Sequence, residues 1–516
     1  METLENILAK SVSNSDANKY LINHSKMVTN FGMEIGNLIY HSDEFDDKEY
    51  GKASFMKSLG MALFLHDIGK INYKFQNLIK NKTRNKFDDD GLENYKSYDD
   101  IRHNVISWAY VISRINGLNK EKYKCITSSI LYHHIVNYDD IDSTYVLKML
   151  SDEELSMMDK FYEYFKMYMI NTHGISYNDF DIITNIGDMC SCSLIGEKPY
   201  INIEVNNNFS PATAYNNESY LQLIRAILIY ADRIVSGGKC DLEKVLNNDI
   251  NYIDEYFNLV SNSSFVDDVN MLCFDYDNNR LQKQIELLNK TNEHNHNVIN
   301  ACPGFGKTLL GLMWFFREKK RLLWVVPRNI IAESTYISII NELEKMNLSD
   351  KVKVGLYYGN EIKDKNCAIN NTDNFDILVT NIDSIVKRTT VNNMANLLVN
   401  MYTSNVVFDE YHEFKMDEPI FSCFIRIMKT RSKFTHSKTL LLSATASDFS
   451  CLWGDAVNKI LDNAVIFGNT KIRMLVHSFD KPEDLLVEKG SVLCFMSCAD
   501  IYKIEDKYKE LLEKGK

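Results

Sequence analysis

The first half of the chain carries histidines and aspartates whose side chains suit divalent-metal chemistry. His66 and Asp67 are adjacent in FLHDIGK. Imidazole and carboxylate are natural ligands of a divalent transition metal, and a carboxylate can bridge two ions. The same residue types recur in other apolar segments: His24, His103, His133, His134 and Asp232. Buried polar side chains need partners, so the set predicts a metal site, although a lone histidine would more often be a hydrogen-bonded core residue.

A glycine-rich loop in the second half suits the binding of a nucleoside triphosphate. ACPGFGKT, from Ala301 to Thr308, fits the P-loop pattern with an alanine in the first glycine position. Gly304 and Gly306 let backbone N–H groups face phosphate oxygens. Lys307 would contact the β and γ phosphates, and the Thr308 hydroxyl would ligate Mg²⁺. The alternative is a chance glycine-rich turn, which the motifs downstream argue against.

Two motifs downstream of the P-loop fit the same nucleotide chemistry. In VVFDEYH, Asp409 would hold Mg²⁺ through water, and Glu410 would polarise the attacking water. His412 would sense the nucleotide and contact the tripeptide SAT, which runs from Ser443 to Thr445. SAT is the candidate for coupling the nucleotide site to a moving nucleic-acid strand. Taken alone, DEYH could be an acidic turn between a strand and a helix.

Weaker candidates surround these motifs. Gln282, upstream of the P-loop, is a candidate for reading adenine, and Gln284 is the alternative. Arg328 in VVPRN and Thr380 in VTNIDS follow or end predicted strands, and both are candidates for contacting a nucleic-acid backbone. For each of them a purely structural role is an equal alternative.

Two kinds of hydrophobic pattern divide the chain. Up to about residue 245, apolar residues recur at three- and four-residue spacing, as in Ser54 to Ile79, which predicts helices. From about Leu281, short β-rich runs such as RLLWVVP and TLLLSAT alternate with helical patterns. Continuous apolar strands between helices predict a parallel sheet covered on both faces. The expected fold class is therefore multidomain, with an all-α domain followed by an α/β P-loop domain.

Composition sets broad limits on the protein. Its 516 residues are enough for about three domains, and its net charge of −12 excludes a uniformly basic nucleic-acid-binding surface but not a local basic groove. Eleven cysteines are scattered, and the one close pair, Cys190 and Cys192, does not complete a zinc site, so reduced cysteines are expected. No apolar run is long enough for a membrane span and no signal pattern opens the chain, so a cytoplasmic location is expected.

From Asp275 to Phe467 the motifs resemble the first RecA-like domain of a superfamily 2 helicase of the DExH type. The resemblance implies a second RecA-like domain with a Q-x-x-G-R-x-x-R motif, whose arginines complete the ATP site. No such motif occurs here, and only its first strand and helix would fit in Ser491 to Lys516. We therefore expect this chain to bind Mg-ATP but to hydrolyse it poorly on its own. Either the protein is truncated, or a second polypeptide completes the motor.

The order H…HD…H…HH…D resembles the HD phosphohydrolase superfamily. With HDIGKINYKFQ and ADRIVS joined to a DExH motor, the chain resembles the CRISPR-associated nuclease-helicases of type I interference systems. The resemblance implies two divalent transition-metal ions, which would be Mn, Co, Ni or Fe. It assigns one to His24, His66, Asp67 and Asp232, and the other to Asp67, His103, His133 and His134. It also implies that Lys70 stabilises charge on the phosphate under attack.

The same resemblance implies the parts of the chain and their activity. The parts are an HD-type nuclease domain (1–245), a linker (246–275), a first RecA-like domain (276–475) and the start of a second (476–516). The implied activity is endo- or exonucleolytic cleavage of single-stranded DNA. It would be coupled to a 3′-to-5′ ATP-dependent motor and recruited by a Cascade-like guide-RNA surveillance complex. Two alternatives remain: a non-translocating platform that binds ATP and nucleic acid, and an HD enzyme that acts on nucleotides.

Overall fold

The computed structural model describes most of the first 444 residues and one short strand beyond them. The described residues are 4–10, 19–40, 52–84, 102–114, 120–131, 133–134, 143–177, 212–258, 278–291, 295–301, 304–358, 361–363, 375–390, 395–435, 437–444 and 465–466. The chain divides into two compact units, Met1–Phe467 and Gly468–Lys516, and every described residue belongs to the first. The expected start of a second RecA-like domain, Thr445 and the pair Cys190 and Cys192 lie outside the described residues.

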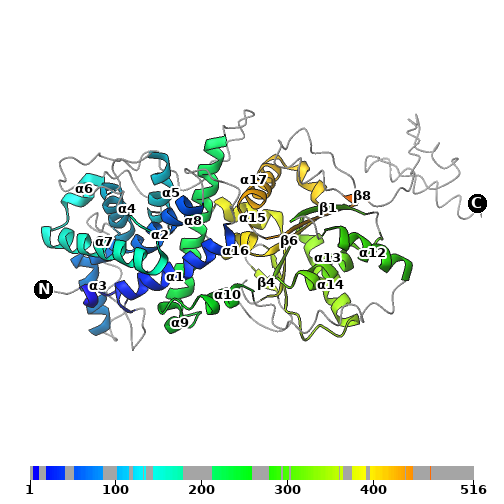
Figure 1. Ribbon diagram of the computed structural model, residues 1–516, viewed down its shortest axis with the longest axis horizontal. Helices are drawn as coiled ribbons and strands as arrows, with labels where there is room; N and C mark the ends of the chain where they lie inside the picture. The colour runs from blue at the N-terminus through cyan, green and yellow to red at the C-terminus, as the bar shows by residue number, and fades with distance from the viewer. Residues whose placement is uncertain are drawn as a thin grey trace, which may run out of the picture. The chain divides into compact units, whose positions relative to one another are not determined.

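The first part of the chain is helical, as Figure 1 shows in blue to green. Its elements are η1 (Leu4–Asn6), α1 (Leu21–Ile39), α2 (Lys52–Leu65), η3 (Ile68–Ile71), α3 (Tyr73–Arg84), α4 (His103–Arg114), α5 (Lys120–Leu131), α6 (Ser143–Lys148), α7 (Asp152–His173), α8 (Ala212–Ser236), α9 (Leu242–Leu246) and α10 (Ile250–Asn258). Local sequence sets several ends. The Ser151 hydroxyl and the Glu154 carboxylate form a reciprocal capping box at the start of α7, and Gly174 ends that helix with φ +68°.

The second part alternates strands with helices. Its elements are α12 (Asn278–Lys290), β1 (His296–Asn300), α13 (Lys307–Glu318), β2 (Leu322–Val326), α14 (Asn329–Lys345), β3 (Val354–Tyr358), β4 (Glu361–Lys363), β5 (Ile377–Asn381), α15 (Ile382–Thr390), α16 (Ala395–Thr403), β6 (Asn405–Asp409), η9 (Tyr411–Met416), α17 (Glu418–Phe434), β7 (Thr439–Ser443) and β8 (Val465–Ile466).

These strands form one sheet in the order β4-β3-β5-β2-β6-β7-β1-β8. The six five-residue strands are parallel, the short β8 continues them at one edge, and β4 pairs antiparallel at the other. Parallel strands need crossover connections, and here most of the crossovers contain helices. The predicted class, a helical domain followed by an α/β domain with a parallel sheet, is confirmed.

Both faces of the sheet are buried, which explains the continuous apolar strands. Along β2, Leu323 and Val325 pack on one side, while Leu322, Trp324 and Val326 pack on the other. Helices α13 and α14 contribute to the core on the Trp324 side, and α15, α16 and α17 contribute to the core on the opposite side (Figure 1). Within the described residues, no helix combines the length and apolarity that a membrane span needs.

A buried polar contact joins three helices of the helical domain. The Asn30 Oδ1 on α1 accepts a hydrogen bond from Tyr168 at 2.6 Å and lies 3.1 Å from His173 Nε2, both on α7. The Asn30 amide donates to the carbonyl of Val245 on α9 at 2.9 Å. Burial lowers the pKa of His173 to about 4, so this imidazole stays neutral near pH 7.

We expect His173 to make the fold sensitive to acid. Between pH 6.5 and about 4, the unfolded chain binds a proton at His173 that the folded chain does not, so the free energy of unfolding falls as the pH drops. His173→Gln keeps a donor toward Asn30 and removes this titration. Urea unfolding at pH 7 and pH 4.5 should show a smaller acid-induced loss in the variant. Equal losses in the two proteins would contradict this role.

Candidate metal centre and nucleotide site

The predicted metal ligands come from five separate places in the helical domain. His24 lies on α1, and His66 and Asp67 directly follow α2. His103 begins α4, and Asp232 lies near the end of α8. His133 and His134 follow α5. The structure brings all seven side chains together, although up to about 200 residues of sequence separate them.

A glycine fixes the HD motif against α4. A Cβ atom at Gly69 would collide with the carbonyl oxygen of His103, so only glycine permits this approach. The Gly69 N–H donates to Ser107 Oγ at 2.9 Å, and the Ser107 hydroxyl donates to the His103 carbonyl at 2.9 Å. The turn after α2 therefore holds Asp67 within reach of His103.

The carboxylate of Asp67 divides the ligands into two groups. Its Oδ2 lies 3.2 Å from His66 Nε2 and 3.4 Å from His24 Nε2. Its Oδ1 lies 3.3 Å from His103 Nε2 and 3.7 Å from His133 Nε2. A carboxylate placed in this way can bridge two cations, one on each oxygen.

Two further side chains complete the two groups. Asp232 Oδ1 lies 3.3 Å from His24 Nε2 and 3.9 Å from His66 Nε2. His134 Nε2 lies 3.1 Å from His103 Nε2. This division matches the two sets implied by the resemblance, while the binding of ions by these sets stays a prediction.

Backbone carbonyls orient two of the imidazoles. His66 Nδ1 lies 2.8 Å from the Leu63 carbonyl oxygen, and His133 Nδ1 lies 2.6 Å from that of Ile130. A carbonyl only accepts, so Nδ1 of each ring carries a proton, and Nε2 is the ring atom that faces Asp67. Second contacts of this type are typical of metal-binding histidines.

Several buried atoms that face the centre lack hydrogen-bond partners among the described residues. They include Nε2 of His24, His66 and His133 and Oδ1 of Asp67. Unpaired polar atoms in a buried site are costly, and a cation would satisfy all of them together. The donor set therefore fits divalent transition metals, which favour imidazole and carboxylate ligands.

The electrostatic environment differs among the candidate ligands. Burial opposes protonation of His24, but contacts with Asp232 and Asp67 raise its pKa. Burial alone would raise the pKa of Asp67, but His66 and Lys70 hold it well below its usual range, with Lys70 Nζ 2.5 Å from Asp67 Oδ2. Burial lowers the pKa of His103, and it lowers that of His134 to about 3. Near neutral pH the carboxylate is therefore charged and these two imidazoles are neutral, as metal ligation requires.

The parallel sheet assembles the nucleotide motifs at one edge. In the order β6-β7-β1, Asp409 pairs with Leu442, and Ser443 pairs with Asn300, the last residue before the P-loop. The carboxyl ends of these strands therefore place DEYH, the start of SAT and the P-loop side by side. Gly304 and Gly306 have φ of +78° and +86°, which explains the need for glycine there.

Glu410 is the centre of the contacts between these motifs. It pairs with Lys307 of the P-loop, and its Oε2 accepts from the Ala444 N–H at 3.2 Å. His412 Nδ1 lies 3.3 Å from Glu410 Oε2 and 2.8 Å from Ser443 Oγ. Glu410 has φ +48°, a costly conformation for a non-glycine residue, as is often found at functional sites. The predicted contact between His412 and the SAT strand is present.

Trp324 supports Asp409, a role that the sequence alone did not indicate. Trp324 is fully buried on β2, and its indole N–H donates to Asp409 Oδ2 at 3.4 Å. Burial raises the pKa of Asp409 to about 6, against the effect of Lys307 and of this hydrogen bond. A tryptophan in a run of apolar strand residues gave no signal of this role, because the contact depends on strand order.

The remaining candidates for contacting nucleotide or nucleic acid differ in how far they are buried. Gln284 is buried, and its amide donates to the carbonyls of Phe305 and Gly306 at 2.7 and 3.3 Å, whereas Gln282 is exposed. The structure thus places Gln284 against the P-loop. Arg328 is 66% exposed and pairs with Glu413 at 3.2 Å. Thr380 is fully buried inside β5, a position that does not support direct contact with nucleic acid.

Thr308 is the second residue of α13, half-buried and directly after Lys307 in the P-loop helix.

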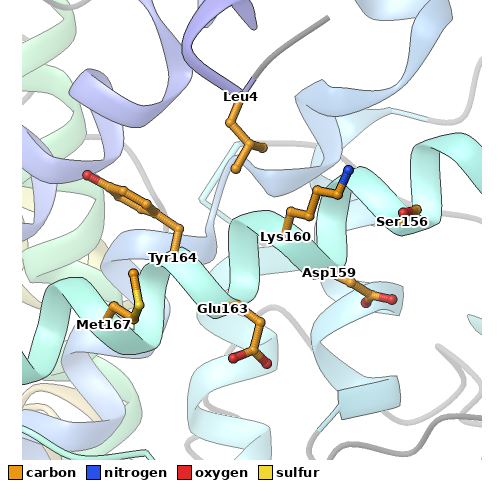
Figure 2. A pocket seen from close by; sticks show the side chains of 7 residues that line it. All are labelled: Leu4, Ser156, Asp159, Lys160, Glu163, Tyr164 and Met167. Carbon is orange, nitrogen blue, oxygen red and sulfur yellow. The ribbon is translucent and has the colours of Figure 1, made fainter. Parts of the chain in front are cut away.

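A pocket of about 400 Å³ on α7, shown in Figure 2, is separate from both sites. Leu4, Tyr164, Met167 and charged residues of α7 line it, and none of the predicted site residues does.

Two family models match the chain. The HD domain of Cas3 matches residues 45–237, and the res subunit of type III restriction enzymes matches residues 270–448. The chain thus carries a region similar to the Cas3 HD domain, followed by a region similar to the restriction-enzyme subunit, in the order that the sequence motifs predicted. The HD match begins after His24, so the geometry around Asp67 is what associates that histidine with the centre.

Solved structures of T. fusca Cas3 share the fold of this chain. The AMPPNP complex is 14% identical with a TM-score of 0.50, covering 88% of this chain and 52% of that one. The ATP complex is 13% identical with a TM-score of 0.51, covering 91% and 53%. The chain thus spans about half the length of these structures, and at this identity the likeness concerns the fold alone. No curated protein matches the chain.

We expect Trp324→Phe to weaken the binding of Mg²⁺-nucleotide about fivefold, because a hydrogen bond to a carboxylate contributes roughly 1 kcal/mol or more. Titration of Mg²⁺ against a fluorescent ATP analogue would measure this. Trp314→Phe is a matched control, since Trp314 is also fully buried and its indole N–H has no hydrogen-bond partner among the described residues. Equal effects of the two substitutions would rule out a specific role for Trp324.

Proposed function

We propose that this chain is a metal-dependent nuclease for single-stranded DNA, joined to an ATP-binding helicase domain, in type I CRISPR interference. The observation that carries the proposal is the buried cluster around Asp67, where imidazoles and carboxylates converge from five places in the fold and several of their atoms lack hydrogen-bond partners among the described residues. A purely structural core would leave these polar atoms at a large cost. The Cas3-type HD match supports hydrolysis of a phosphodiester as the reaction class.

Two groups of residues would hold the ions. His24, His66, Asp67 and Asp232 would form one, and Asp67, His103, His133 and His134 the other. Divalent ions at such a centre supply positive charge that polarises the phosphodiester and acidifies water. We expect Mn, Co, Ni or Fe, because the donor set is rich in imidazole.

The chain's own residues prepare this chemistry. The carbonyls of Leu63 and Ile130 fix the tautomers of His66 and His133, so their Nε2 atoms face the centre. Lys70 brings a positive charge to 2.5 Å from Asp67 Oδ2. A lysine at this position can also stabilise negative charge on a phosphate that approaches the carboxylate.

The helicase domain would bind Mg-ATP at the sheet edge. Lys307 would exchange its pairing with Glu410 for the phosphates, which frees Glu410 to orient water. Asp409 and Thr308 would hold Mg²⁺. The paired arginines of a Q-x-x-G-R-x-x-R motif do not occur in this sequence, so we propose that turnover and 3′-to-5′ translocation require arginines supplied from elsewhere.

We infer the substrate and the partner from the resemblance to Cas3. We propose that a Cascade-like guide-RNA surveillance complex presents a displaced DNA strand, which the HD centre then cleaves. A flexible single strand can reach a buried centre among helices more readily than a stiff duplex can. These assignments concern the whole assembly and are proposals for this chain.

We expect His66→Ala or Asp67→Ala to reduce Mn²⁺- or Ni²⁺-dependent cleavage of circular single-stranded DNA at least 100-fold, because either change removes a ligand. Metal content, measured on the purified proteins, should fall in parallel. His173→Gln is a matched control on another histidine and should cleave normally at pH 7.5. Cleavage unchanged by both ligand substitutions would refute the nuclease assignment. Phosphate release from deoxynucleotides without DNA cleavage would favour an HD enzyme acting on nucleotides.

Lys307→Ala should separate the two sites. We expect it to abolish ATP binding, because Lys307 is the P-loop cation, and to leave metal-dependent cleavage within about twofold of wild type. Equilibrium binding of a fluorescent ATP analogue and a nuclease assay without ATP would measure both. Parallel loss of binding and cleavage would contradict two independent sites.

A further inference from the structure

Helix α3 is basic in a protein whose net charge is −12. Between Tyr73 and Lys80 it contains Lys74 and Lys80 and no acidic residue. It begins at Tyr73, three residues after Lys70 of the HD motif. A basic helix beside a phosphodiester centre suits a polyanion, because it places counter-charges where the rest of the surface would repel the ligand.

The first turn of α3 is fixed to the metal motif. The Gln76 amide donates to the carbonyls of Lys70 and Leu8 at 2.7 and 2.9 Å. Tyr73 donates its hydroxyl to Glu153 and its N–H to Glu154, both at 2.7 Å. These contacts hold the first turn of α3, on both sides of Phe75 in the sequence, next to the HD motif.

Phe75 presents an aromatic ring beside the proposed metal ligands. Its centroid lies 5.3 Å from that of the His103 ring, with the planes at 57°. Lys70 Nζ, which pairs with Asp67, lies 5.7 Å from the Phe75 centroid. Phe75 is only half-buried, and Leu78, one helical turn on, is 40% exposed. Lys74, also exposed, adjoins this face.

We propose that Phe75 and Lys74 form a binding subsite for single-stranded nucleic acid at the HD centre, with one base stacked on Phe75 and a phosphate near Lys74. This rests on the proposed function and adds the residues that position its substrate. Stacking on an aromatic ring accepts any base, which suits cleavage without sequence preference. A different role for Phe75 would be to hold the His103 ring in place, and the experiment separates the two.

The test compares Phe75→Leu and Phe75→Trp with wild type on a labelled oligo-dT and on an abasic oligonucleotide of equal length. Affinity is measured by anisotropy in EDTA, and cleavage by KM and kcat with Mn²⁺. Stacking contributes about 1–3 kcal/mol per base, so we expect Phe75→Leu to weaken oligo-dT binding and raise its KM at least fivefold. Binding of the abasic strand should not change, and Phe75→Trp should retain the preference for bases.

Two measurements complete the comparison. Phe75→Leu should retain wild-type metal content. Lys74→Glu should weaken binding and flatten its salt dependence by about 0.7 in log–log slope per lost phosphate contact. Lys160→Glu is the matched charge reversal. Lys160 is exposed on α7, where it lines the pocket in Figure 2, and its reversal should leave the affinity for DNA and its salt dependence unchanged.

The outcomes distinguish the subsite from the nuclease assignment. Loss of metal, or equal loss on oligo-dT and abasic strands, would show that Phe75 only supports His103 and would overturn the subsite. Unchanged affinity in Phe75→Leu would overturn it as well. If wild type cleaves no single strand but Phe75→Leu still loses base-dependent binding, the subsite stands and the nuclease assignment fails.

Discussion

The helical domain depends on one buried carboxylate. Asp67 is 1% exposed, and a charged group can occupy such a position only if it is paired. Imidazoles from α1, α4 and the segment after α5 face its two oxygens, together with the adjacent His66 and with Lys70 of η3. These contacts bring the helices together around Asp67, and they leave several buried imidazole nitrogens and one carboxylate oxygen without hydrogen-bond partners among the described residues. The constraint that stabilises the core is thus the same one that prepares the proposed metal centre.

The α/β domain brings residues that are distant in sequence together at one edge of its sheet. A parallel sheet gathers the carboxyl ends of its strands, so three motifs that are far apart in sequence reach one place. Glu410 then joins them through Lys307, His412 and the Ala444 N–H. Because Glu410 pairs with the P-loop lysine, a nucleotide bound at Lys307 would rearrange the contacts of DEYH with the end of β7. Such a rearrangement would connect the proposed nucleotide site with the strand of SAT.

Local sequence predicted the elements better than it predicted the individual partners. Periodicity gave the helical and α/β parts, because a core-facing helix and a doubly covered strand each require a fixed spacing of apolar residues. It did not decide between Gln282 and Gln284, since both lie on α12 and only packing shows that the latter meets the P-loop. The motif VTNIDS suggested Thr380 as a contact for nucleic acid, whereas strand β5 buries that side chain. Trp324 gave no signal at all.

The sequence by itself determined the chemistry available to this protein: a histidine-rich donor set, a P-loop, and acidic strand ends in a fixed order. These follow from residue type and spacing, which are local properties of the chain. The tertiary structure decided how the donors divide. Only the approach of α4 to Gly69 and of α8 to α1 places one group on each oxygen of Asp67. That division depends on packing between helices distant in sequence, and no local pattern encodes the distance between two side chains that meet only after folding.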